Sequence, residues 1–105
     1  MSEEVRVAWT TFPDADAARR IAEQLVNERF AACANILPSI GSVFRWQGKV
    51  EQTNETLVIF KLAASRYEGF AAKLKSIHPY DVPEILVLPV VGGWPDYLRW
   101  VCENS

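Results

Sequence analysis

The chain has 105 residues and a formal net charge of −2 at pH 7; half of the residues are hydrophobic and 23% are charged. This composition is typical of one soluble globular domain, and the charge argues against a nucleic-acid partner held by a basic surface. No apolar run is long enough to span a membrane, and the acidic start has no apolar signal segment. We therefore expect a cytoplasmic protein in which Cys33, buried among alanines, and the partly exposed Cys102 are free thiols.

Hydrophobic periodicity predicts strands and helices in alternation. Asp14 is suited to cap the first helix, and Ser65 with Glu68 has the form of a capping box before the second. Pro79 ends that second helix at His78, because the residue before a proline disfavours helical geometry. The expected strands cover 5–10, 33–37, 43–46 with 49–51, 55–62 and 85–91, and the expected helices cover 14–29, 65–77 and 95–101.

The order βαββαβ with a short final helix predicts an α+β, ferredoxin-like sandwich in which two helices cover one face of an antiparallel sheet. An extended β-hairpin arm turns at Gln47-Gly48. The strands at 55–62 and 85–91 are apolar on both faces except at Lys61, whereas a bare face should carry alternating polar residues. We expect another copy of the chain to cover this face in an obligate assembly. Phe60→Asp or Leu88→Asp should therefore abolish folded protein.

The run from His78 to Ile85 places an imidazole, a phenol and two carboxylates on a connector that two prolines stiffen. Lys61, the lone charge of its strand, must reach solvent or pair with an acid. We hypothesise one ligand-binding cleft at a subunit boundary; the plainer alternative is a turn whose polar groups satisfy the local backbone. The residues assigned to the cleft are Lys61, Glu55, Tyr80, Asp81, Glu84 and Trp46, with His78 beside them; Trp46 is alternatively an interface anchor.

Motifs spread over nearly the whole chain are similar to those of one family. They are Thr10-Thr11-Phe12-Pro13-Asp14, Phe30-Ala31-Ala32-Cys33-Ala34-Asn35-Ile36, Ser42-Val43-Phe44-Arg45-Trp46-Gln47-Gly48-Lys49, the connector 78–85 and Tyr97-Leu98-Arg99-Trp100. On these motifs the chain resembles the CutA family, named for tolerance to divalent cations, as a single domain over residues 5–103. The resemblance implies a cytoplasmic homotrimer, related in architecture to PII signalling proteins, that binds copper or other divalent ions.

One histidine limits the metal site that this resemblance implies. Some members of the family offer copper a cysteine in the first-strand motif and two adjacent histidines, whereas this chain has Ile77-His78. Copper and zinc favour several imidazole or thiolate ligands, so His78 with nearby carboxylates predicts only weak Cu²⁺ or Zn²⁺ binding, not required for folding. The alternative is a hydrogen-bonded structural histidine at a helix end.

Three classes of function follow from these patterns. The first is a non-enzymatic homotrimer that binds a divalent metal or a small ligand in intersubunit clefts, linked to metal-ion tolerance or signalling. An acid–base enzyme is disfavoured, because the sequence has no nucleophile elbow, phosphate loop or multi-ligand metal motif. The alternative to the first class is a stable trimeric scaffold that recruits an unknown protein partner and uses no physiological metal.

Overall fold

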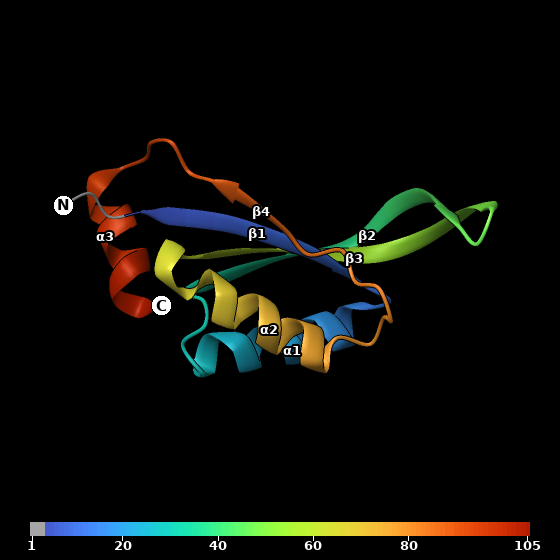
Figure 1. The fold of residues 1–105 in the computed structure, drawn as a ribbon, viewed down its shortest axis with the longest axis horizontal. Coiled ribbons are helices and arrows are strands. Elements are labelled where there is room, and N and C mark those ends of the chain that lie inside the picture. Colours follow the sequence, from blue (N-terminus) through green and yellow to red (C-terminus); the bar gives the residue numbers. More distant parts are fainter. Residues whose placement is uncertain (1–3) are drawn as a thin grey trace.

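A four-stranded antiparallel sheet with helices α1 and α2 along one face forms the body of the protein in the computed structural model, which describes residues 4–105 (Figure 1). Most of the acidic start that argued against a signal peptide, residues 1–3, lies outside this range. In chain order the elements are β1 (Val5–Phe12), α1 (Ala15–Asn27), β2 (Cys33–Trp46), β3 (Lys49–Ala63), a 3-10 turn η1 (Ala64–Arg66), α2 (Tyr67–Ile77), β4 (Leu86–Pro89) and α3 (Pro95–Asn104).

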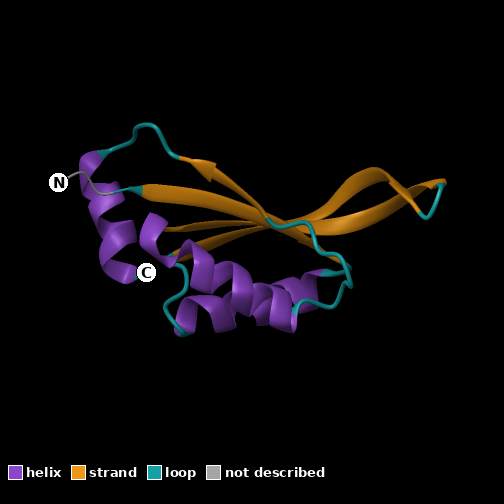
Figure 2. Ribbon diagram, viewed as in Figure 1, coloured by secondary structure: helices purple, strands orange, loops and turns teal. Residues whose placement is uncertain are grey.

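The strands lie in the order β2-β3-β1-β4, and every neighbouring pair is antiparallel. This is the order that two split βαβ units produce, so the predicted α+β, ferredoxin-like plan is confirmed. β2 and β3 continue past the body as a hairpin arm, which Figure 2 shows without helices on either side. Gln47 and Gly48 both have positive φ at its tip, which suits a two-residue turn between twisted strands.

Four local expectations were wrong. Pro38 does not interrupt β2, because the strand absorbs it in a register shift between Leu37 and Ile40, on a sheet edge where a missing N–H costs little. Ser65 does not cap α2, since residues 64–66 form a 3-10 turn and the cap position passes to Arg66 without a side-chain bond. β4 is shorter and α3 longer than the apolar pattern predicts.

The core lies between the sheet and the two helices α1 and α2. Phe60 of β3 and Phe70 of α2 meet edge to face with ring centroids 5.0 Å apart, a favourable geometry for aromatic pairs. Asp14 caps α1 as predicted, since its carboxylate accepts the Ala17 N–H at 2.8 Å. The largest fully buried side chains include Phe12, Ile21, Leu25, Phe60, Leu62, Phe70 and Leu74.

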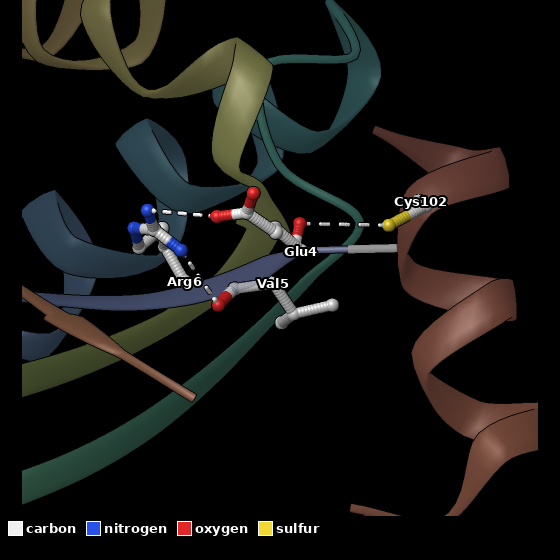
Figure 3. A network of polar contacts seen from close by, with 4 residues as sticks. All are labelled: Glu4, Val5, Arg6 and Cys102. Atoms are coloured by element: carbon white, nitrogen blue, oxygen red, sulfur yellow. Dashed lines mark hydrogen bonds and ion pairs between the residues drawn. The ribbon is translucent and has the colours of Figure 1, made fainter. Parts of the chain in front are cut away.

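α3 closes the end of the sheet where the chain begins. Val101 is buried against Val5, and the Cys102 thiol lies 3.7 Å from the carbonyl oxygen of Glu4, as Figure 3 shows. In the same view the Arg6 guanidinium contacts the Glu4 carboxylate at 3.2 Å. Cys102 is therefore partly exposed and forms no disulfide, as the sequence predicts, and its thiol contacts the start of the described chain.

The sheet face that turns away from α1 and α2 is also apolar, and we call it the open face. Cross-strand partners share a face, and the register sets Val7 opposite Lys61 and Leu88, and Trp9 opposite Ile59 and Leu86. Leu86 and Leu88 are 50% and 44% exposed. The apolar second face predicted from the sequence is thus present, and the described chain leaves part of it uncovered.

Candidate functional site

The connector 78–85 begins at a histidine whose two ring nitrogens both have partners. Nε2 of His78 lies 2.9 Å from the Thr11 carbonyl oxygen and 3.0 Å from the Thr10 hydroxyl. Nδ1 lies 3.1 Å from the backbone nitrogen of Tyr80. Because the Tyr80 N–H can only donate, Nδ1 accepts and the proton resides on Nε2, which donates to Thr11. The hydrogen-bond network therefore fixes one neutral tautomer.

Burial keeps this imidazole neutral. His78 is 9% exposed, and its ring stacks on Phe12 with centroids 4.6 Å apart. Burial first, and then the charge of Lys75, lower the pKa of His78 below its usual value of 6.5, while the Thr11 carbonyl and Glu55 act in the opposite direction. The balance favours an uncharged ring at neutral pH.

Tyr80 joins the connector to the sheet. Its phenol donates to the Glu55 carboxylate at 2.8 Å, and Glu55 is itself buried. Burial, the hydrogen bond to Glu55 and the charge of Asp14 all raise the pKa of Tyr80, so the phenol stays protonated at physiological pH. A group whose pKa moves away from neutrality is poorly suited to acid–base catalysis, and Tyr80 with Glu55 is better described as a fixed hydrogen-bonded pair.

The structure brings together three of the predicted cleft residues: Glu55, His78 and Tyr80, with both ends of the set anchored on the sheet. Two threonines of β1 complete this group, which we call the polar cluster: Thr10, Thr11, Glu55, His78 and Tyr80. Asp81 and Glu84 follow on the same connector, where both are exposed to solvent.

Lys61 and Trp46 do not join the polar cluster within one copy of the chain. Lys61 is six positions along β3 from Glu55, about 20 Å at the usual rise of a strand, and its ammonium donates to the Asn35 side chain. Trp46 lies at the tip of the arm, opposite Lys49. Lys49 is also six positions along β3 from Glu55, in the other direction. Within one copy these residues do not form a single cleft, and the cleft predicted at a subunit boundary stays a prediction.

Within one copy, the hydrogen bonds of His78 leave no ring lone pair open to a metal. A metal needs a ring lone pair, and the lone pair on Nδ1 already accepts the Tyr80 N–H. Among residues 4–105, no three His, Cys, Asp or Glu side chains lie close enough together to hold an ion. The alternative of a structural histidine at a helix end is the better description of His78.

Sequence reasoning missed two contacts that only the fold creates. Thr10 and Thr11 contact a histidine 68 and 67 positions away, which the sequence analysis did not anticipate. Cys33 was placed in the core, but its register opposite Lys61 sets it on the open face, where it is partly exposed. The available signal for the first contact was the pair of adjacent threonines near the end of the first strand.

A groove follows the free edge of β2. It has a volume of about 380 Å³ and lies between α1 and α3, with Trp100 at one side and Arg19 and Glu23 on its rim. Its apolar lining includes Ile36 of the edge strand. β4 forms the opposite edge of the sheet, so within the described chain β2 and β4 each have one edge without a strand partner.

Taken together, these features define a small α+β protein with one apolar sheet face left open and a polar cluster saturated by its own hydrogen bonds. A family model described as CutA1 divalent ion tolerance protein matches residues 6–104. The chain therefore belongs to the CutA divalent-cation tolerance family, as its motifs indicate.

Individual relatives agree over nearly the full chain. The Divalent-cation tolerance protein CutA of Thermus thermophilus is 42% identical over 94% of this chain and 96% of its own. Protein CutA, chloroplastic, of Arabidopsis thaliana is 41% identical, and there the chain spans only 54% of the relative's length. The crystal structure of CutA1 from Oryza sativa has a TM-score of 0.95 at 38% identity, covering 99% of this chain and 95% of that one.

The described helices are all too short or too polar to cross a membrane, within residues 4–105.

Proposed function

We propose that the protein is a non-enzymatic homotrimer that acts in divalent-cation tolerance, with the open face as its subunit interface. The single observation that carries this proposal is the apolar open face, where Leu86 and Leu88 remain about half exposed in one copy. Exposed apolar surface of this kind marks a contact with another protein surface. The number three comes from the resemblance to the family, and the two unpaired sheet edges suit a head-to-tail ring.

Divalent ions then bind at subunit boundaries rather than inside one copy. A single copy offers no cluster of three ligands within residues 4–105, so ligands must be pooled between neighbours. The carboxylates of Asp81 and Glu84 are available to contribute, because both residues are exposed to solvent. Binding of Cu²⁺ or Zn²⁺ is micromolar or weaker and is not needed for folding.

Calorimetric titration with Cu²⁺ and with Zn²⁺ tests this assignment. The double variant Asp81→Asn, Glu84→Gln should lose most of the heat of binding, because the ligating charges are removed. The matched control is Asp16→Asn, Glu68→Gln, which makes the same change in charge at exposed positions on α1 and α2. Equal binding by both double variants would contradict a site on the connector.

A second candidate function is a trimeric scaffold that recruits a protein partner, and the arm favours it. Val43 and Val50 are 69% and 60% exposed on the arm, and Phe44 and Trp46 are exposed beside them. An apolar surface on a projecting hairpin is suited to binding another protein. An intact trimer that gives no heat with either metal would favour the scaffold over the cation-binding protein.

The cytoplasm is the proposed compartment. Neither Cys33 nor Cys102 forms a disulfide, as is usual where the surroundings are reducing. The name of the Arabidopsis relative assigns that protein to the chloroplast, so compartment varies within the family. Cell fractionation with an antibody against the chain decides the matter, and recovery in a membrane-enclosed compartment would contradict the proposal.

A further inference from the structure

We propose that His78 is a pH switch: a proton on its ring releases the connector 78–85 from the end of the sheet. The switch depends on one hydrogen bond between the ring and the backbone: Nδ1 of His78 accepts the Tyr80 N–H at 3.1 Å. This bond makes the position of the connector depend on the charge of one side chain.

The neutral ring matches its surroundings and the charged ring does not. When His78 is protonated, Nε2–H still donates to the Thr11 carbonyl at 2.9 Å. Nδ1 changes from acceptor to donor, and it then faces the Tyr80 N–H, which also can only donate. The ring has little freedom to turn away, because it is stacked on Phe12 with centroids 4.6 Å apart. The backbone at Tyr80 must therefore move.

That movement spreads along the connector. The phenol of Tyr80 holds the connector to β3 through its 2.8 Å bond to Glu55, so a shift at Tyr80 strains this second attachment as well. Pro79 and Pro83 stiffen the segment, which makes it move as a unit rather than bend at one residue. Protonation thus frees the Glu55 carboxylate together with the connector.

The surroundings of the ring determine whether the switch responds to acid or to base. Burial is the largest influence and lowers the pKa of His78, so release requires acidification below the usual value of 6.5. The groups of β1 that contact the His78 ring are all uncharged: the Thr10 hydroxyl, the Thr11 carbonyl and the Phe12 ring. Charged groups from the neighbouring elements act on the two residues. Lys75 of α2 and Glu55 of β3 act on His78, and Glu55 and Asp14, which precedes α1, act on Tyr80.

The same reasoning fixes the pH dependence of stability. A histidine with a folded-state pKa below its unfolded value takes up protons more readily when unfolded. Its contribution to the free energy of unfolding is complete above pH 6.5 and is lost as the pH falls from 6.5 through the lowered pKa of the folded state.

NMR spectroscopy tests the switch directly, because His78 is the only histidine in the chain. Ring ¹⁵N shifts and exchange of the Tyr80 amide hydrogen are followed between pH 8 and pH 4.5. At pH 8 we expect the neutral tautomer with its proton on Nε2. On acidification, the protection of the Tyr80 amide, corrected for the intrinsic exchange rate, should fall at least tenfold with the midpoint of the ring titration.

The matched control is His78→Asn. Its side-chain oxygen can accept the N–H two residues later, as in an Asx turn, but it does not titrate in this range. This variant should keep the Tyr80 amide protected throughout. Unchanged protection in the wild type while the ring titrates would overturn the switch, as would an equal loss in His78→Asn. If that variant does not fold, the wild-type titration alone decides.

Discussion

The two faces of the sheet are built from the same kinds of residues, yet only one is covered by the chain itself. On the helix side Phe60 is fully buried, with Phe70 packed against it. On the open face Leu88 stands opposite Val7 and is still 44% exposed. The difference shows that an apolar strand pattern predicts that a face will be covered, but not whether the cover comes from the same chain.

The largest effect should come from the helix side of the sheet. Phe60→Ala removes a buried ring and should lower the free energy of unfolding by about 3–5 kcal/mol. The expectation that Phe60 belongs to the subunit interface was wrong, because its strand position points it at α2. Chemical denaturation measures the loss. A cost below 1 kcal/mol would mean that this face is less tightly packed than the structure shows.

A change on the open face should act on assembly instead. Leu88→Asp places a charge where another copy is proposed to pack, which costs several kcal/mol of association when the carboxylate is unpaired. Size-exclusion chromatography with light scattering should show monomers that keep their secondary structure.

The control for that variant is Ala72→Asp on the exposed side of α2, which should leave the oligomer intact. If Leu88→Asp assembles as well as Ala72→Asp does, the open face is not the interface. If Leu88→Asp instead unfolds, the isolated copy depends on its partners for stability, as in many obligate oligomers.

A smaller effect is expected within the polar cluster. Hydrogen bonds to charged groups contribute roughly 1.5–3 kcal/mol, so Tyr80→Phe should destabilise the protein by about that amount. A double-mutant cycle of Tyr80→Phe with Glu55→Gln should show a coupling of about 1 kcal/mol or more, because the two side chains share one bond. Additive effects would remove Tyr80 as the attachment between connector and β3.

The smallest effect concerns the start of α1. Asp14→Ala deletes the carboxylate that accepts the Ala17 N–H and should cost about 1 kcal/mol of stability. Asp14→Asn keeps a capping oxygen and should recover most of this loss. Thermal denaturation of the two variants makes the comparison, and equal melting temperatures would show that the cap contributes nothing beyond its charge.

Local chemistry made part of this structure predictable. Asp14 and the Gln47-Gly48 turn act through neighbours in the sequence, and both were predicted correctly. The βαββαβ order and the apolar second face followed from periodicity.

The rest depends on register, which no local pattern contains. Lys61 was expected beside the connector, but the pairing of β3 with β2 sets it near Asn35 instead. Thr10 reaches His78 only because β1 ends beneath the end of α2. Residues far apart in the sequence can be placed together only after the sheet order and its register are known.

Sedimentation equilibrium at micromolar concentration tests the central claim most directly, because it reports the mass of the assembly without regard to its shape. If copies of this chain cover the open face as proposed, the measured mass is three times that of one chain. A mass of two chains would contradict the trimer, but it would still agree with the claim that another copy covers the open face. A monomer that stays soluble with its open face uncovered would contradict the account as a whole.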